Sequence, residues 1–470
     1  MNRLINVVKL HSTIVFTSCK NCGGSGLTRF WNIHHFMKIK TMTTQNTSQI
    51  EIVNQIVLNL RGEGIVHLKL DDVPMADRRL VHLDGKALLN FSSCNYVGLE
   101  ADERLKRAAI SAIEKYGTQY YCVRAYTSLY PYQELEESMR QIFGFPAIVM
   151  PTTMLGHLSC LPSLVGSGDA VIMDHQVHTS VQMTTKILKA GGVHVEMIRH
   201  NRMDYLESRI QKLREDYKKI WYLADGVYSM YGNIAPMGEL YELLQRYEQF
   251  YLYIDDSHGM SWTGKHGSGS VLEGMPFHPH LILTTSLGKA FGASGGVAVF
   301  HDQATKELVM NTGSPLIFTG PLQPATLGAA VASAKIHLSD EIVDLQDRLK
   351  ANIDYFHQKA SSLDLPIISR DKTPIFFLGV GRLEVGSKLV KALMNVGIFS
   401  GIACYPSVPY NNTGVRFMVT LNHTFADIDF LLETIAGVLP EILASENYSL
   451  EQIWKAFSKD EANRKRIETA

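Results

Sequence analysis

The stretch LILTTSLGKAFG, residues 281–292, indicates the fold and carries a candidate reactive group. Its apolar first half, Leu281–Thr285, is short and not alternating, which is typical of a strand buried on both faces. Lys289 follows between Gly288 and Ala290, whose small size lets a planar ligand approach the amine closely. Desolvation there would lower the pKa of the lysine and suit it to Schiff-base chemistry. Taken alone the pattern is a weak indication, because most lysines are solvated.

Short apolar runs of the same kind recur along the chain, separated by helical stretches. They are Ala147–Met150, Ala170–Met173, Val193–Met197, Trp221–Ala224, Tyr251–Ile254 and Gly296–Phe300. Helical patterns over 104–116 and 131–143 each end at a glycine, Gly117 and Gly144. Alternation of strand and helix predicts an α/β fold with a mainly parallel sheet covered on both faces. Functional side chains are then expected just beyond the carboxyl ends of the strands.

A second candidate group lies in YIDDSHG, residues 253–259, where an apolar strand ends in Asp255. A carboxylate at that point could hold the protonated nitrogen of a pyridine ring, whose charge makes it an electron sink. In isolation, helix capping by Asp255 and Asp256 is the better interpretation, since Asp is a preferred N-cap residue. Because Lys289 follows about one helix and one strand later, adjacent parallel strands would bring both groups to one pocket, which favours a cofactor site.

Two further polar segments follow predicted strands. They are DHQVHTS (174–180), whose His178 could stack on a pyridine ring, and DGVYSMYG (225–232), which opens into a polar turn. Each also fits an ordinary loop or turn when taken alone. The four segments together, in this order and spacing, are a far more specific indication of a cofactor site than any one of them alone.

Composition excludes several classes of protein. The chain has 470 residues, 46% hydrophobic and 19% charged, which excludes a mainly disordered chain. A formal net charge of −1 gives no reason to expect nucleic acid as a partner. No apolar run approaches the roughly 18 residues that span a bilayer. Six cysteines in this length are not a disulfide framework, so a reducing, cytoplasmic location is expected, and we expect no metal site.

The first fifty residues form a basic leader, with no Asp or Glu before Glu51. Such a segment resembles a transit peptide, but a true start at Met37 or Met42 explains it equally well. The pair Cys19 and Cys22 is a weak zinc or redox signal, and incidental cysteines are the better interpretation. Beyond the leader (1–50) we expect an N-terminal segment (51–110), a large cofactor-binding domain (111–330), a small C-terminal α/β domain (331–445) and a charged, solvated C-terminal helix (446–470).

From about Asn90 to Leu439 the chain resembles the α-oxoamine synthases, which are pyridoxal 5'-phosphate (PLP) enzymes. The matching stretches are Asn95-Tyr96-Val97-Gly98-Leu99, His178-Thr179-Ser180, Tyr228-Ser229-Met230, Asp255–Gly259, Gly288–Gly292, and Arg416–Thr420 with His423-Thr424. The resemblance implies fold type I of the PLP-dependent transferases, the aspartate aminotransferase-like fold.

The resemblance also implies a role for each matched residue. Lys289 binds the cofactor covalently and moves protons at the substrate α-carbon, while Asp255 pairs with the pyridine nitrogen and His178 stacks on the ring. His258 completes the implied catalytic set and, with Ser229, lies near the phenolic oxygen of the cofactor or the substrate carbonyl. The other implied cofactor contacts are Ser286, Thr153, Met154 and, from the neighbouring subunit, Thr319. The implied substrate contacts are Arg416, which holds the amino-acid carboxylate, Asn95 and Arg124.

The implied reaction condenses an amino acid with an acyl thioester (acyl-CoA or acyl-ACP), releases carbon dioxide and gives an α-aminoketone. By analogy the product is a sphingoid-like or sulfonolipid base, and the enzyme is a homodimer with shared active sites. Two alternatives stay open: an aminotransferase or carbon–carbon lyase of the same fold, and a non-catalytic partner subunit of a heteromeric synthase. Retention of Lys289, Asp255 and His178 argues against the partner subunit.

Three departures from the family pattern indicate a divergent member. Residues 117–131 are rich in tyrosine where the family has a glycine-rich segment, which suits either a subunit interface or a substrate role. His157 stands where relatives often have Asn. Tyr231 replaces an Asp of the family pattern.

Overall fold

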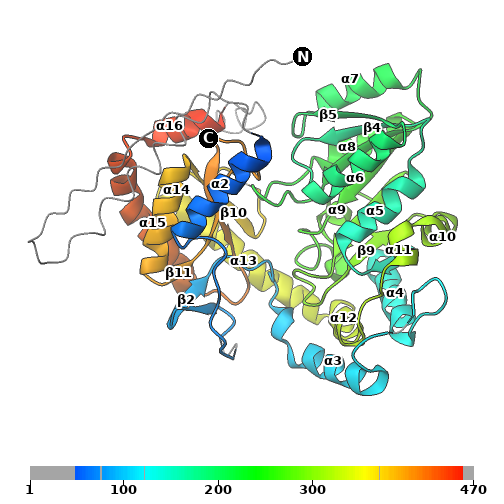
Figure 1. Ribbon diagram of the computed structural model, residues 1–470, viewed down its shortest axis with the longest axis horizontal. Coiled ribbons are helices and arrows are strands. Elements are labelled where there is room, and N and C mark those ends of the chain that lie inside the picture. The colour runs from blue at the N-terminus through cyan, green and yellow to red at the C-terminus, as the bar shows by residue number, and fades with distance from the viewer. Residues whose placement is uncertain (1–47, 75–76, 121, 370, 459–470) are drawn as a thin grey trace, which may run out of the picture. The chain divides into compact units, whose positions relative to one another are not determined.

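The computed structural model describes residues 48–74, 77–120, 122–369 and 371–458 (Figure 1). The chain divides into two units, 1–58 and 59–470. Of the first unit the structure describes residues 48–58, most of which lie in helix α2 (Gln49–Gly62). The interpretations of the basic leader, including Cys19 and Cys22, therefore fall outside the described residues. The rest of the fold belongs to the second unit.

The second unit is built on a seven-stranded sheet in the order β3-β9-β8-β7-β6-β4-β5. Its strands are β3 (Ala147–Met150), β4 (Ala170–Asp174), β5 (His194–Ile198), β6 (Ile220–Asp225), β7 (Phe250–Asp255), β8 (Leu281–Ser286) and β9 (Gly296–Val299). The five strands β4 to β8 are parallel, and β9 runs antiparallel to both β8 and β3. The predicted mainly parallel sheet is confirmed, and each predicted run is a strand.

Helices cover both faces of this sheet because its inner strands are apolar on both sides. In β6, for example, Ile220, Tyr222 and Ala224 join one buried cluster, while Trp221 and Leu223 join another. The first cluster includes side chains of α4 (Tyr130–Phe143), α7 (Met203–Leu213), α8 (Met237–Arg246) and α12 (Pro324–His337). The second includes side chains of α5 (Thr153–Leu164), α6 (Thr179–Ala190), α10 (Gln303–Thr312) and α11 (Ser314–Phe318).

Strand β5 differs from the expectation of burial on both faces. It pairs only with β4 and forms an edge of the sheet, and Met197 within it is 54% exposed. An edge strand is covered less completely, so a short apolar run does not by itself distinguish a central strand from an edge strand.

Helix ends agree with the glycine signals in the sequence. Helix α3 (Glu103–Tyr116) ends at Gly117 with φ of +81°, and α4 ends at Gly144 with φ of +77°. Positive φ is a conformation that glycine adopts without a steric cost. After the large sheet, residues 324–362 are almost entirely helical, in α12 and α13 (Glu341–Ser362).

The rest of the chain forms two three-stranded sheets. One has the order β10-β13-β12, with β10 (Ile375–Gly381), β13 (Thr413–Met418) and β12 (Gly401–Ala403). The other has the order β1-β2-β11, with β1 (Leu80–Leu83), β2 (Lys86–Asn90) and β11 (Ile398–Phe399). The apolar run 397–402 is thus split at Ser400 between two sheets. Helix α14 (Leu383–Asn395) packs against both sheets, and α15 (Phe425–Ser445) packs against α14 and α13.

The last described helix, α16 (Leu450–Phe457), is not simply a solvated surface helix. Ile453 and Phe457 are fully buried, and the Phe457 ring packs edge-on against Phe377 and Tyr231. Tyr231, one of the three departures from the family pattern, therefore has a packing role between the turn after β6 and the C-terminal elements. In the described parts of the chain, no helix combines the length and apolar character needed to cross a membrane.

Candidate active site

A cavity of about 350 Å³ opens where the carboxyl ends of β6, β7 and β8 meet the N-terminus of α5. It is lined by Thr152, Thr153, Met154, His178, Ser180, Asp225, Val227, Asp255, Ser257, His258, Ser286, Gly288, Lys289, Ser294 and Gly295. Seven of the residues predicted for the site are therefore brought together in one place. They are Lys289, Asp255, His178, His258, Ser286, Thr153 and Met154.

Lys289 stands in a tight turn between β8 and β9. The turn is closed by the amide of Leu287, which donates to the carbonyl of Gly295 at 3.0 Å. Burial lowers the pKa of Lys289, and the negative charge of Asp255 opposes the shift. A larger neutral fraction makes the amine a better nucleophile toward a carbonyl carbon.

Asp255 is a buried carboxylate that is held from both of its oxygens. Its Oδ1 accepts from the amide of Ser257 at 3.0 Å and from the Ser257 hydroxyl at 2.5 Å. Its Oδ2 lies 3.1 Å from Nε2 of His157. Burial opposes ionisation, but the hydrogen bonds from His157 and Ser257 and the cation of Lys289 outweigh it and hold the pKa of Asp255 far below its usual range. The cavity thus has a permanent negative charge on one wall.

Asp225 is a second carboxyl group on the same wall. It ends β6 and lies in register with Asp255 at the end of β7. Burial and the neighbouring charge of Asp255 raise the pKa of Asp225 well above its usual range. One of its oxygens accepts from the amide of His178 at 3.1 Å. The motif 225–232 contained this residue, but its role depends on the register with β7, which the sequence does not display.

His178 is the N-cap of α6. Its Nδ1 is 2.6 Å from the hydroxyl of Ser180 and accepts from the Ser180 amide at 3.3 Å. These bonds fix the ring at the mouth of the cavity, where one side of it stays exposed. The pKa of His178 is lowered, chiefly by burial of its other side, so the ring is neutral at pH 7 and suited to stacking.

The opposite end of the cavity suits an anion. The N-terminus of α5 opens there, with Thr152 capping the amide of Leu155 at 3.1 Å. Ser286 contributes a hydroxyl from the end of β8. Gly296 of β9 passes so close that a Cβ atom would lie 2.6 Å from the amide nitrogen of Thr153. Free amides and the helix dipole make such an N-terminus a ready phosphate site.

His258 and Arg416 come to the site from different elements. Nδ1 of His258 lies 2.8 Å from the hydroxyl of Tyr96. Burial is the main cause of a pKa well below the usual range for His258, and the cations of Lys289 and Arg416 add to it. Arg416 also acts electrostatically on Lys289, although it does not line the cavity itself. Within the described residues no carboxylate pairs with Arg416, and its guanidinium contacts the sulfur atoms of Cys94 and Met418.

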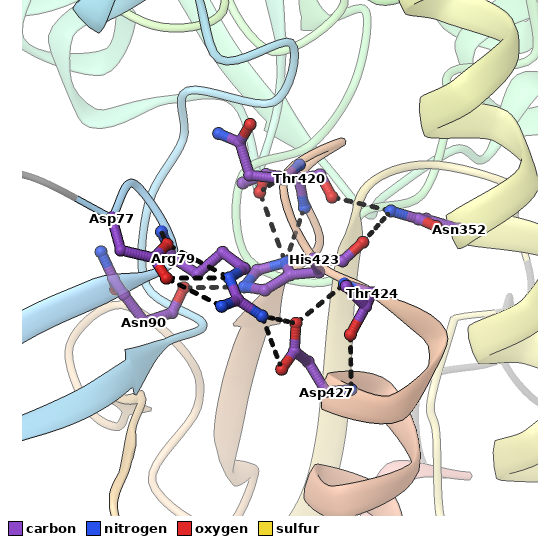
Figure 2. Close-up of polar contacts among 9 residues, drawn as sticks. Asp77, Arg79, Asn90, Asn352, Thr420, His423, Thr424 and Asp427 are labelled. Atoms are coloured by element: carbon purple, nitrogen blue, oxygen red, sulfur yellow. Dashed lines mark hydrogen bonds and ion pairs between the residues drawn. The ribbon is translucent and has the colours of Figure 1, made fainter.

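A hydrogen-bonded network holds the segment that carries Cys94, Asn95 and Tyr96 against the end of β13. Figure 2 shows His423 at its centre, with Asn352 on one side and the ion pairs of Arg79 on the other. Nε2 of His423 is 3.1 Å from the carbonyl of Asn90, and its Nδ1 accepts from the amide of Thr420 at 3.0 Å. The His423 ring also stacks on Phe91 at 4.2 Å.

Other predicted residues do not line the cavity. Arg124 donates to the carbonyl of Val149 at 2.6 Å and to Glu136 at 2.8 Å, and it lies 4.1 Å from the ring of Tyr132. These partners give its guanidinium a structural role in this conformation. Three more predicted residues lie outside the lining, namely Asn95, Ser229 and Thr319.

His157 is the residue whose position sequence reasoning noticed without assigning a role. In the sequence it stands out only as a departure from the family pattern, yet it is fully buried and bonded to Asp255. The available signal was its spacing, since Thr153 and His157 are one helical turn apart and share a face of α5.

Comparisons with known proteins agree with this geometry. Residues 86–435, well over half of the chain, match the family described as "Aminotransferase class I and II". The chain is 32% identical over 391 residues to the 8-amino-7-oxononanoate synthase of Coprothermobacter proteolyticus, covering 82% of this chain and 96% of that protein. It is 31% identical over 397 residues to the same enzyme of Fervidobacterium nodosum, covering 83% and 97%.

Solved structures show the same fold. The serine palmitoyltransferase of Sphingomonas wittichii superposes with a TM-score of 0.77 at 20% identity, covering 85% of this chain and 99% of that one. The serine palmitoyltransferase of S. paucimobilis with bound PLP–myriocin aldimine superposes with a TM-score of 0.75 at 22% identity, covering 82% and 96%. The predicted aspartate aminotransferase-like architecture is confirmed.

Proposed function

The chain belongs to the aminotransferase class I and II family, in its α-oxoamine synthase branch, and we propose that it condenses an amino acid with an acyl thioester by means of PLP. The observation that carries the proposal is the meeting of Lys289, Asp255 and His178 around one cavity. An amine, a permanent carboxylate and a flat neutral ring are the three groups that a pyridine aldehyde requires.

The residues of the cavity fit PLP. Lys289 supplies the amine for covalent attachment, and Asp255 supplies the charge that keeps a pyridine nitrogen protonated. The N-terminus of α5, together with Ser286, suits the phosphate group. When bound, the cofactor supplies a ring that accepts the electrons of a bond broken at the amino-acid α-carbon.

The chain's own residues then bind and orient the substrates. The guanidinium of Arg416 binds the amino-acid carboxylate, for which its fork geometry suits two parallel hydrogen bonds. His178 covers one face of the ring and limits how the bound amino acid can rotate, which orients the bond to be broken. Lys289 removes and returns the proton at the α-carbon, since its lowered pKa favours the neutral amine.

The expected products are an α-aminoketone, carbon dioxide and free thiol. We propose a long-chain acyl donor carried on coenzyme A or acyl carrier protein, and a sphingoid-like or sulfonolipid base as product. A transaminase would release neither carbon dioxide nor thiol, and a lyase would need no thioester. A non-catalytic partner subunit would have no need of the Lys289–Asp255 arrangement.

We also propose a homodimer, with Thr319 reaching the cofactor phosphate of the neighbouring subunit. Three large aromatic side chains are strongly exposed in the single chain, Tyr126 (81%), Tyr130 (66%) and Phe318 (78%), the last of which adjoins Thr319. A second copy of the chain would cover such apolar area. Analytical ultracentrifugation of the active protein tests this, and an active monomer would refute it.

The function is tested by titrating the purified protein with PLP and then with glycine, L-alanine, L-serine and L-cysteate. The visible absorbance of the bound cofactor identifies the amino acid, and release of carbon dioxide and thiol is measured after a long-chain acyl thioester is added. Lys289→Ala is expected to abolish both releases, while the matched control Lys186→Ala, exposed on α6, leaves them unchanged. Conversion of the cofactor to its amine form without carbon dioxide would identify an aminotransferase instead. Absence of cofactor binding would favour the partner subunit.

A further inference from the structure

His157 lies behind the cavity, and both of its ring nitrogens form hydrogen bonds to side chains of strand β7. Its Nε2 is 3.1 Å from Oδ2 of Asp255, and its Nδ1 is 2.9 Å from the hydroxyl of Tyr253. Tyr253 and Asp255 are two residues apart on β7, so their side chains share one face of the sheet. The imidazole is 0% exposed and does not line the cavity. It therefore contacts the cavity only through Asp255.

The chemistry of the two neighbours fixes where the imidazole proton resides. An ionised carboxylate can only accept, so Nε2 of His157 must carry a proton and donate it to Asp255. The phenol of Tyr253 is fully enclosed, and burial raises its pKa well above the usual value, so it keeps its proton. The Tyr253 hydroxyl can then donate to Nδ1, which leaves a neutral imidazole in one tautomer.

With this bond Asp255 receives three hydrogen bonds, one from His157 and two from Ser257. A carboxylate with that many donors is both immobile and strongly biased toward ionisation. Its remaining lone pairs are left for a group in the cavity. Thr153 and His157 lie on the same face of α5. Thr153 contacts the anion end of the cavity and His157 contacts Asp255, so α5 positions both ends of the site.

We propose that His157 is a positioning residue, which Tyr253 fixes in its Nε2-protonated tautomer and which holds Asp255 aimed at the nitrogen of the cofactor ring. The expected effect of His157 on PLP binding rests on the proposed function. The hydrogen bonds among His157, Asp255 and Tyr253 do not depend on the cofactor. It also accounts for His at a position where the family pattern often has Asn: the longer imidazole bridges Asp255 and Tyr253 at once.

The experiment compares His157→Gln, whose amide can replace the Nε2 donor, with His157→Leu, which has no donor. His337→Leu is the matched control, because His337 is also 0% exposed and hydrogen-bonded, to Ser333 and Ser261, but lies away from the cavity. The apoproteins are titrated with PLP, and their melting temperatures are measured without it. We expect His157→Leu to weaken PLP binding by about tenfold or more, and His157→Gln to recover most of the affinity.

A purely structural role would give a different pattern. The two leucine variants would then melt at similarly lowered temperatures and bind PLP as the wild type does, which would overturn the proposal. Equal affinity of His157→Gln and His157→Leu would overturn it as well.

A second measurement needs no cofactor. The ¹⁵N chemical shifts of the histidines in the apoprotein are expected to include a neutral, Nε2-protonated His157, assigned by its change in Tyr253→Phe. A His157 protonated only at Nδ1 would overturn the inference. Failure of the wild-type protein to bind PLP would instead refute the proposed function and leave this assignment standing.

Discussion

Lowering the pH should weaken the network around His423, and the structure gives the size of the effect. Burial, with the nearby cation of Arg79, lowers the pKa of His423 from 6.5 to about 4. A histidine with a depressed pKa in the folded state stabilises the protein above its unfolded pKa. That stability is lost as the pH falls from 6.5 toward 4, because the unfolded chain then binds the proton more readily.

The magnitude follows from these two pKa values. At pH 5 the unfolded form of His423 is almost fully protonated and the folded form almost fully neutral. The linkage relation then gives a loss of about 2 kcal/mol of unfolding free energy between pH 7 and pH 5. Other groups also titrate in this range, so the effect must be measured against a variant that lacks only this one.

The variant is His423→Asn, whose side-chain oxygen can still accept from the amide of Thr420. Urea unfolding, followed by tryptophan fluorescence, is measured for both proteins at pH 7 and pH 5. The wild type should lose about 2 kcal/mol more than the variant over this interval, although it is the more stable protein at pH 7. Parallel losses in the two proteins would show that His423 accepts a proton in the folded state, and would refute the account of the network in Figure 2.

Three other outcomes are expected. Gly226→Ala should lower the melting temperature by several degrees, because its Cβ would overlap the buried carboxylate of Asp256, whereas Gly166→Ala, with nothing within 4 Å, should leave it nearly unchanged. Arg416→Lys should raise the KM for the amino acid by about 10- to 100-fold with a smaller effect on the thioester, because an ammonium cannot make two parallel bonds to a carboxylate; equal effects on both substrates would contradict this. Asp225→Asn should reduce the affinity for PLP much less than Asp255→Asn in a direct titration, because the raised pKa of Asp225 favours the neutral carboxyl, which an amide resembles; equal losses for the two variants would contradict it.

Strands of the large sheet could be predicted because each is a short run of apolar residues bounded by polar ones. The direction of β9 could not, since a run such as Gly296–Val299 reads the same whether it pairs parallel or antiparallel. The division of the run 397–402 at Ser400 could not be predicted from the sequence, for a similar reason. Both halves of the run 397–402 are apolar, and only their partners, β2 and β13, separate them.

The site was predictable where a reactive residue follows a strand. Lys289, Asp255 and His178 all do so, and parallel strands place such residues at one edge. The roles of His157 and Asp225 depend on partners from other segments, which a single sequence does not display. Arg124 illustrates the same limit, because its contacts with Glu136 and Val149 appear only once α4 packs on β3.

The antiparallel insertion of β9 also constrains the order of assembly during synthesis. Strand β3 has one neighbour in the sheet, and that neighbour is β9, almost 150 residues later in the chain. A growing chain has therefore made β4 to β8 before β3 and the start of α5 gain their partner. Contacts so distant in sequence form slowly, and until they form an unpaired strand edge is exposed. In a nascent chain that ends before Gly296, β3 and the start of α5 have no strand to hold them beside Ser286, so we expect the anion end of the site to form only after β9 is translated.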